Sequence, residues 1–88
     1  MLMKIELVYC AAWHYTDRAI SVMADLLKEF EFKIESITLI PSDGGRFELT
    51  VNGDLLYSKL RTNRHRDKAQ ASRLVRDYLK ENAWQKRR

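Results

Sequence analysis

The segment YCAAWHY, residues 9–15, holds the residue types with the clearest chemical potential in this chain. Cys10 is the only cysteine, and the sequence that follows it takes on helical periodicity. A thiol just before a helix N-terminus is often reactive, because the partial positive charge of the helix end favours the thiolate. A dithiol site would need a second cysteine at position 13, where Trp13 stands. Cys10 is therefore a candidate redox thiol with no second thiol in the chain.

Two interpretations of Cys10 stay open at the level of sequence. In the first, His14 and Arg18, about one and two helical turns away, stabilise the thiolate, with His14 the nearer candidate. Such a thiol forms a mixed disulfide with glutathione as co-substrate, and a second glutathione molecule removes it. In the second, Cys10 is buried and inert, because the indole of Trp13 packs over it and disfavours the charged form.

Trp13 and the histidines also have more than one interpretation. Trp13 is either an aromatic plug in a redundant active-site turn or an exposed binding anchor, since tryptophan is enriched among interface hot spots. Cys10, His14 and His65 offer three possible metal ligands. A Cys-x3-His spacing alone is not a zinc signature, however, and a fourth ligand is missing. We therefore expect no metal site.

The positive charge of the chain is concentrated in its last third. Residues 1–58 carry 5 Lys and Arg against 9 Asp and Glu, whereas residues 59–88 carry 11 against 3. Arg64, His65 and Arg66 lie at the centre of this basic region and are candidate binding residues. They suit the carboxylates of glutathione or an acidic partner protein. Nucleic acid suits them less well, because no nucleic-acid motif or row of aromatic residues accompanies them. A solvated helix face is the simplest alternative.

Length and composition describe a small globular protein. Eighty-eight residues with 45% hydrophobic content suffice for one domain with a single core. We expect this domain to span residues 1–82, followed by a basic tail at residues 83–88. One cysteine cannot form an internal disulfide, which fits a reducing compartment. No segment has the layout of a signal peptide or the length of a membrane span, so we expect a cytoplasmic protein without membrane association.

The first half of the chain is predicted to form a strand, a helix and a second strand. Apolar residues alternate over 3–9, which predicts a strand. Helical spacing over 13–30 predicts an apolar stripe that holds Ile20, Met23, Leu27 and Phe30 and is widened by Ala19 and Leu26. A second strand is expected over 34–41.

The second half is predicted to form a hairpin and a final helix. The hairpin covers 45–59, and its inward positions are Phe47, Leu49 and Val51. Asn52 and Gly53 supply the positive φ angles that a tight turn requires. A helix is expected over 67–82.

The resulting order, β-α-β-β-β-α, indicates an α/β fold. A strand–helix–strand unit favours parallel strands joined by a crossover helix, and the hairpin then extends the sheet with antiparallel strands. We expect a thioredoxin-like two-layer sandwich with a four-stranded mixed sheet.

Three segments carry a resemblance to a known family. A strand ends in Tyr9-Cys10, the hairpin opens with GGRFE at 44–48, and the chain returns through GDLLYSK at 53–59. These features are similar to those of the selenoprotein W-related family, also called Rdx, over about residues 3–80. The resemblance implies a thioredoxin-like fold and a role in thiol redox chemistry, linked to glutathione and partner proteins.

The chain departs from the family pattern at two places. Cys10 stands at the first redox position of the family, but Trp13 stands at the second. Where members tend to carry a Gly…Phe-Pro loop, residues 63–67 read NRHRD. A dithiol mechanism needs a second thiol to resolve the mixed disulfide. We therefore expect a single-cysteine thiol-redox protein; the alternatives are a redox-silent protein-interaction module on the same fold and a weak nucleic-acid binder.

Overall fold

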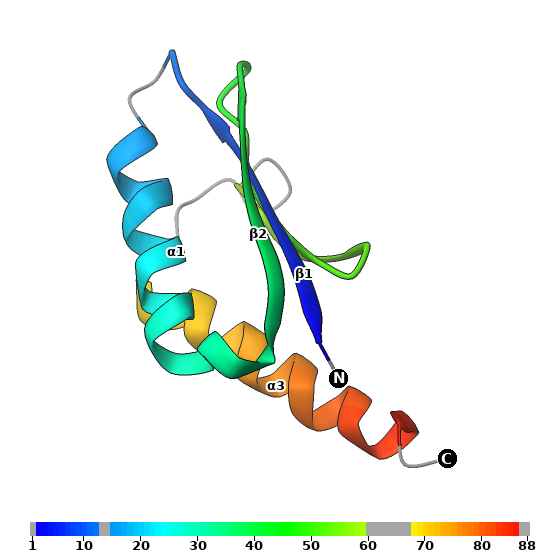
Figure 1. Ribbon diagram of the computed structural model, residues 1–88. Coiled ribbons are helices and arrows are strands. Elements are labelled where there is room, and N and C mark those ends of the chain that lie inside the picture. The colour runs from blue at the N-terminus through cyan, green and yellow to red at the C-terminus, as the bar shows by residue number, and fades with distance from the viewer. Residues whose placement is uncertain (1, 13–14, 60–67, 87–88) are drawn as a thin grey trace.

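The computed structural model describes residues 2–12, 15–59 and 68–86 of the chain. Its elements are β1 (Met3–Cys10), α1 (Thr16–Phe30), a 3-10 turn (Glu31–Lys33), β2 (Ile34–Ser42), β3 (Phe47–Val51), β4 (Asp54–Ser58) and α3 (Lys68–Lys86). A four-stranded sheet forms one layer and the helices form the other (Figure 1). The predicted order of elements is confirmed.

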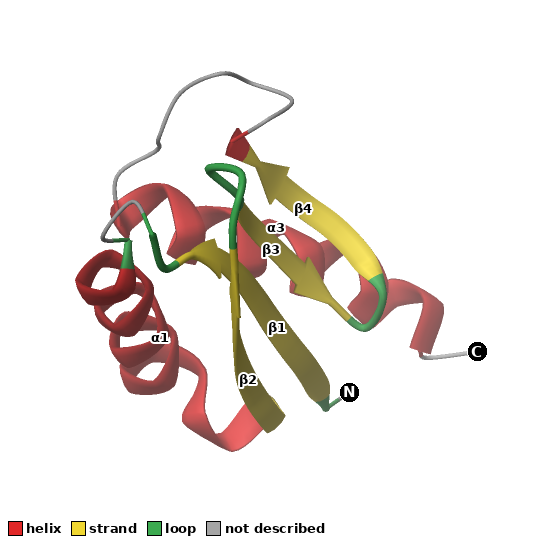
Figure 2. Cartoon of the chain, turned by 90° about the horizontal axis from the view of Figure 1, so that it is seen from above, coloured by secondary structure: helices red, strands yellow, loops and turns green. Residues whose placement is uncertain are grey.

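Strand β1 lies inside the sheet, whose order is β2-β1-β3-β4 (Figure 2). It pairs in parallel with β2, from Met3 opposite Ile34 to Cys10 opposite Ser42. On its other side it pairs antiparallel with β3, and β3 pairs antiparallel with β4. Helix α1 is the crossover that the parallel pair requires. The predicted mixed sheet and two-layer α/β fold are therefore confirmed.

The hydrophobic core fills the space between the sheet and the helices. Every second side chain of β1 from Met3 to Tyr9 is buried there, as strand geometry requires. Strand β3 adds Phe47, Leu49 and Val51, and α3 adds Val75 and Tyr78. Each large apolar side chain buried in this way contributes roughly 1.5–3 kcal/mol relative to leaving it exposed. The inward alternation predicted for β3 is confirmed.

The apolar stripe predicted for helix α1 is confirmed in part: four of its six residues are buried, but the buried face is rotated away from Ile20 and Leu27. Its buried residues are Ala19, Val22, Met23, Leu26 and Phe30. Ile20 and Leu27, placed in the predicted stripe, are instead 52% and 40% exposed. Apolar residues surround more than half of this helix, so periodicity alone could not fix the centre of the stripe. The sheet covers only the side of the helix that contacts β1 and β2. The flank of the helix that carries Ile20 and Leu27 lies outside this contact.

The start of α1 also differs from the prediction. The helix begins at Thr16, whereas it was expected from position 13. Tyr15 precedes it as the N-cap, with φ −86° and ψ 2° and no side-chain hydrogen bond to the helix end. Trp13 and His14 lie outside the described residues.

The hairpin turn and the last helix follow the sequence closely. Asn52 and Gly53 have φ angles of 51° and 86°, which confirms the predicted turn. Helix α3 begins at Lys68 and ends at Lys86, so it extends into the residues expected to form a basic tail. Within the described ranges, no helix combines the length and the hydropathy needed to cross a membrane.

Candidate functional site at the end of strand β1

Cys10 is the last residue of β1, where the chain leaves the sheet and turns towards α1. The N–H of Ala11 donates to the carbonyl of Ser42 at 3.0 Å, which holds the end of β1 against β2. The N–H of Tyr15 donates to the carbonyl of Cys10 at 3.3 Å, which closes the turn from the other side. Backbone hydrogen bonds therefore fix both ends of the segment that begins at the thiol.

The side chain of Cys10 is fully buried, with 0% of its surface exposed. It does not belong to the hydrophobic cluster between the sheet and the helices, although its neighbour Tyr9 does. Side chains alternate along a strand, so Cys10 shares the parity of Lys4, Glu6 and Val8, which are not part of that cluster either. The thiol is therefore fully buried, but on the strand parity opposite to that of the β1 side chains in this cluster.

The sequence predicts that the N-terminus of α1, His14 and Arg18 stabilise the thiolate of Cys10. The structure describes the helix end and Arg18. Helix α1 begins at Thr16, six residues after Cys10, and carries Asp17 in its first turn. The negative charge of Asp17 offsets part of the positive potential of the helix end. The N–H of Tyr15, at the N-cap, is directed to the carbonyl of Cys10 and not to the thiol. Arg18 lies on the exposed side of the helix.

Most of the other predicted site residues cannot be placed. His14, Trp13, Arg64, His65 and Arg66 lie outside the described residues. Their assignments as thiolate stabiliser and as binding residues stay predictions. Of the residues named for this site, the structure places Cys10 and Arg18.

A row of aromatic rings lies between the turn and the hairpin, and its residues are far apart in the sequence. The ring of Tyr15 meets that of Phe47 edge to face, with centroids 6.0 Å apart and an interplanar angle of 77°. Phe47 meets Tyr57 in the same way at 6.5 Å. Edge-to-face aromatic pairs add roughly 0.5–1.5 kcal/mol beyond their buried area. The segment before α1 is thus tied to β3 and β4 through aromatic contacts.

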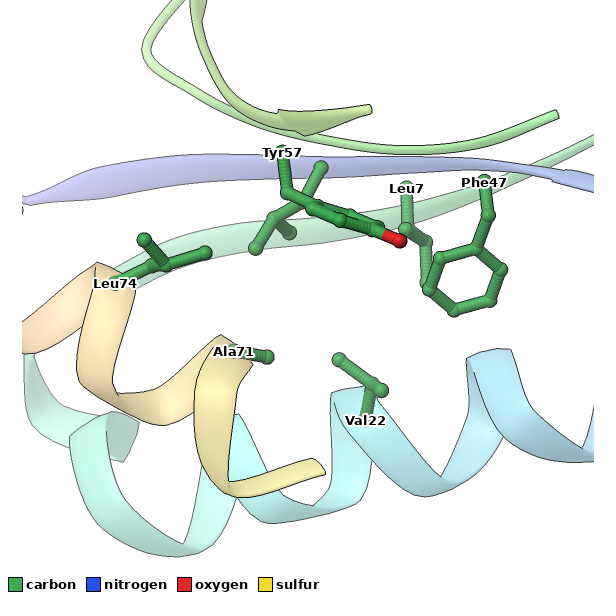
Figure 3. A pocket seen from close by; sticks show the side chains of 7 residues that line it. Leu7, Val22, Phe47, Tyr57, Ala71 and Leu74 are labelled. Atoms are coloured by element: carbon green, nitrogen blue, oxygen red, sulfur yellow. The ribbon is translucent and has the colours of Figure 1, made fainter. Parts of the chain in front are cut away.

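An apolar cavity lies beneath these rings, between the sheet and the two helices (Figure 3). It is lined by Leu7, Val22, Phe47, Leu49, Tyr57, Ala71 and Leu74. The volume of the cavity is about 20 Å³, which is little more than the space that one water molecule needs. The cavity is far too small for a peptide such as glutathione, which would have to bind on the surface.

The face of the sheet opposite the core cluster holds a polar pair that sequence reasoning missed. The Ser58 hydroxyl donates to Oε2 of Glu48 at 3.1 Å, and Ser58 is only 3% exposed. Glu48 stands opposite Val8 of β1, on the parity shared by Cys10. The predicted turn would place Glu48 opposite Tyr57, but a register irregularity between Leu49 and Thr50 shifts the pairing by one residue and brings Ser58 opposite Glu48.

The charges of α3 are mixed where the structure describes them. Arg73, Arg76 and Lys80 are exposed on this helix, and Asp77 and Glu81 stand among them. Nε of Arg76 donates to Oε2 of Glu29 on α1 at 2.9 Å, so this guanidinium serves to join the helices. Arg73, Arg76 and Lys80 follow one another at helical spacing, and Asp77 and Glu81 lie directly beside this basic row, so negative charge borders it. In the described part of the chain, no group of three or more His, Cys, Asp or Glu residues could hold a metal ion.

Comparison with known proteins identifies the family. The sequence pattern of the Rdx family matches residues 4–77, most of the chain. The chain belongs to the Rdx family. Its fold is similar to that of a selenoprotein W-related protein from Vibrio cholerae, with a TM-score of 0.84 and 28% identity over 90% of this chain and 99% of that one. A protein from Bordetella parapertussis also gives a TM-score of 0.84, with 25% identity over 90% of this chain and all of the other.

No curated protein matches the chain. The family resemblance expected from the hairpin and from Tyr9-Cys10 is therefore confirmed by the family pattern and by the solved structures. It supports a thioredoxin-like protein of the selenoprotein W-related type.

Proposed function

We propose that this Rdx protein is a single-thiol redox protein in which Cys10 exchanges with glutathione or with a thiol of a partner protein. The place of Cys10 in the fold carries the proposal. It is the last residue of β1, it lies outside the main hydrophobic cluster, and the exposed Ala11 and Ala12 follow it directly. A thiol at such a junction needs only a local rearrangement to meet solvent, whereas a core residue needs much wider unfolding.

The proposed exchange has two steps. The Cys10 thiolate attacks the glutathione sulfur of a mixed disulfide between glutathione and a partner protein, the disulfide bond breaks, and the cysteine of the partner leaves as a thiolate. A free glutathione thiolate then attacks the mixed disulfide at Cys10, which releases the Cys10 thiolate and forms glutathione disulfide. Because the chain has one cysteine, every step uses an external thiol. Efficient reduction of protein disulfides is therefore not expected.

The burial of Cys10 adds an opening step before the exchange. With 0% of the side chain exposed, no disulfide can reach the sulfur in the closed structure. The observed rate is then the intrinsic rate multiplied by the fraction of molecules in which the site is open. Trp13, Arg64, His65 and Arg66 are proposed to contact the partner protein or the carboxylates of glutathione, supported by the excess of positive charge over residues 59–88.

A second candidate function is a redox-silent protein-interaction module. The complete burial of Cys10 favours it, because a thiol that opens only on global unfolding has no redox role. Weak nucleic-acid binding is the least supported alternative. The described charges of α3 are mixed in sign, and Arg76 is engaged with Glu29.

The two candidates differ in how Cys10 becomes accessible. The rate of Cys10 alkylation in the native protein, divided by the rate in denaturant, gives the fraction of molecules in which this site is open. The free energy of opening follows from that fraction. The same protein unfolded by urea gives the global free energy of unfolding. A redox thiol requires an opening free energy well below the global value. Equality of the two values would overturn the redox proposal and support the redox-silent module.

A product measurement completes the test. After incubation with glutathione disulfide, native protein is expected to gain the mass of one glutathionyl group, and reduced glutathione should remove it. Cys10→Ser is the matched control and should gain no mass. Failure of the native protein to form the adduct, while the urea-unfolded protein forms it, would contradict the proposed exchange.

A further inference from the structure

Helix α1 has an apolar flank that the fold leaves exposed. Ile20, Ala24 and Leu27 follow one another at helical spacing, and Ile20 and Leu27 are 52% and 40% exposed. Glu29 faces α3, because it binds Arg76 there. At about 100° per residue, Ile20 and Leu27 lie on the side of α1 opposite Glu29. The apolar flank therefore faces away from α3, towards the outer edge of the sheet.

Strand β2 forms that edge. Among the described strands it pairs with β1 alone, so its outer side carries backbone groups with no strand partner there (Figure 2). Natural edge strands are normally protected by charges, prolines or bulges. Strand β2 has such protection only near its two ends. A register irregularity lies at Glu35 near the start, and Pro41 lies near the end. The central segment 36–40, SITLI, has no charge.

Apolar side chains of β2 extend the same surface. Ile37 and Leu39 are half-buried and pack against the core from the helix side. Together with Ile20 and Leu27 of α1 they form a strip of partly exposed apolar side chains along the sheet edge, which we call the α1–β2 edge. Uncovered apolar surface beside an open strand edge is typical of an interface.

We propose that the α1–β2 edge binds a second copy of this chain in a twofold-symmetric dimer, joining the two sheets through β2. The sequence of the edge is complementary to itself. In an antiparallel β2 pair centred on Thr38, Ile37 faces Leu39 of the second copy and Thr38 faces its own counterpart. Threonine pairs across antiparallel strands are favourable, and the contact between Ile37 and Leu39 buries apolar surface of both side chains.

The same symmetry pairs the two α1 helices. In antiparallel packing, Ile20 lies opposite Leu27 of the second copy, and the small Ala24 lies near the axis, where it permits close approach. Asp17 in the first turn then lies near Lys28 in the last turn of the other helix, and both residues are exposed. Two opposite-charge pairs form, and a parallel arrangement would bring like charges together.

One twofold axis can serve both elements. The helix and the strand start from a common end, because only Glu31–Lys33 separates Phe30 from Ile34. The midpoint between Ile20 and Leu27 is about 10 Å from that end along the helix. Thr38 is about 13 Å from it along the strand. The helix pair and the strand pair are therefore centred at nearly the same level.

The self-complementary pattern distinguishes a second copy from an unrelated strand-forming peptide. A peptide could use the backbone edge of β2, but nothing would then place an apolar residue on Ile20 and opposite charges on Asp17 and Lys28. The surface is limited to one strand and one helix flank, so we expect a reversible dimer that dissociates on dilution.

Sedimentation equilibrium of the full chain tests the proposal. The apparent molecular mass should rise with protein concentration from 10.4 kDa, the mass of one chain, towards twice that value. A reducing agent must be present, so that a disulfide between two Cys10 residues cannot imitate the dimer. Ile20→Glu should weaken dimerisation at least about tenfold, because it would bury an unpaired carboxylate.

A charge exchange gives the sharper result. Asp17→Lys or Lys28→Asp alone should weaken the dimer severalfold, and the double variant should restore it. Both changes oppose the helix dipole, so restoration cannot reflect a more stable helix. Leu55→Glu is the control, since Leu55 is 42% exposed on β4 at the other edge, and it should leave the dimer unchanged.

Three results would overturn the proposal. One is a monomer at all concentrations up to about the millimolar range, where even weak interfaces are occupied. Another is a dimer that is insensitive to Ile20→Glu and to both single charge changes. The third is a dimer lost in Leu55→Glu, which would place the interface at β4. Circular dichroism of each variant verifies that it is folded, and the test does not depend on the redox activity of Cys10.

Discussion

The hydroxyl of Tyr78 donates a hydrogen bond to Oδ2 of Asp54 at 2.8 Å. The contact joins the middle of α3 to the first residue of β4. It complements the pair between Arg76 and Glu29, which joins the same helix to α1. Helix α3 is thus held by polar contacts on both sides of its buried apolar face. Burial, followed by the hydrogen bond to Asp54 and its negative charge, raises the pKa of Tyr78 above its usual value.

Tyr78→Phe should therefore destabilise the protein. The change keeps the buried ring but removes the hydroxyl, which leaves the Asp54 carboxylate without this donor. Hydrogen bonds to charged groups contribute roughly 1.5–3 kcal/mol, and we expect a value near the lower end because Asp54 is exposed. Urea unfolding at pH 8 measures the difference, and an equal stability of the two proteins would show that the contact does not contribute.

The stability that Tyr78 provides should also depend on pH. Its raised pKa in the folded state means that the folded protein keeps the phenolic proton at a pH where the unfolded chain loses it. The contribution is therefore fully present below about pH 10, the usual value for tyrosine, and is lost as the pH rises through the higher folded value. Tyr78→Phe lacks this group, so the stability difference between the two proteins should shrink above about pH 10. A difference that stays constant up to pH 11 would contradict this.

The fold was predictable because its local signals agree with one another. Alternation in β1 and β3, the Asn52-Gly53 turn and the change to helical periodicity each indicate one type of element, and together they allow few topologies. The face of α1 was not predictable in the same way. Apolar residues at 19, 20, 22, 23, 26, 27 and 30 fit two neighbouring stripes. Only the position of the helix over β1 and β2 decides between them.

Alanine substitutions at neighbouring positions test the corrected face of α1. Leu26→Ala should cost about 2–5 kcal/mol, because Leu26 is fully buried and its loss leaves a cavity. Leu27→Ala should cost less than about 1 kcal/mol, since this side chain is 40% exposed. Thermal or urea unfolding at low protein concentration, where the chain is monomeric, gives both values. Equal losses would support the original stripe instead.

Asn52 allows a test of the hairpin turn. Its Oδ1 accepts from the N–H of Lys4 at 2.8 Å, and its own N–H donates to the carbonyl of Lys4 at 2.9 Å. Asn52→Gly keeps the positive φ but loses the side-chain bond, for a cost of about 1 kcal/mol. Asn52→Ala loses the same bond and adds left-handed strain of about 1 kcal/mol or more. The alanine variant should therefore be the less stable in urea; the reverse order would show that the φ of 51° is not strained for alanine.

The candidate site was predictable only in part, for physical reasons. The position of Cys10 at the end of β1 follows from strand alternation and from the family pattern. Its complete burial does not, because a strand end can be open or covered depending on segments distant in sequence. The aromatic contacts of Tyr15 with Phe47 likewise depend on the β1–β3 register. Long-range packing decides these features, and periodicity reports only local structure.

Trp13→Cys tests whether the segment after β1 retains the geometry of a dithiol site. The change restores Cys-x-x-Cys spacing with Cys10, and in a thioredoxin-like turn the backbone brings two such sulfurs within bonding distance. We expect an intramolecular disulfide under mild oxidation, seen as the loss of two hydrogens in the mass of the intact protein without bound glutathione. Trp13→Ser is the matched control, because it removes the indole to the same extent without adding a thiol. A disulfide accompanied by a small loss of stability would show that position 13 still belongs to a redox-type turn. A loss near the 3–5 kcal/mol typical of removing a core tryptophan, without a disulfide, would mean that the indole has become part of the packing, and the redox role of Cys10 would be abandoned.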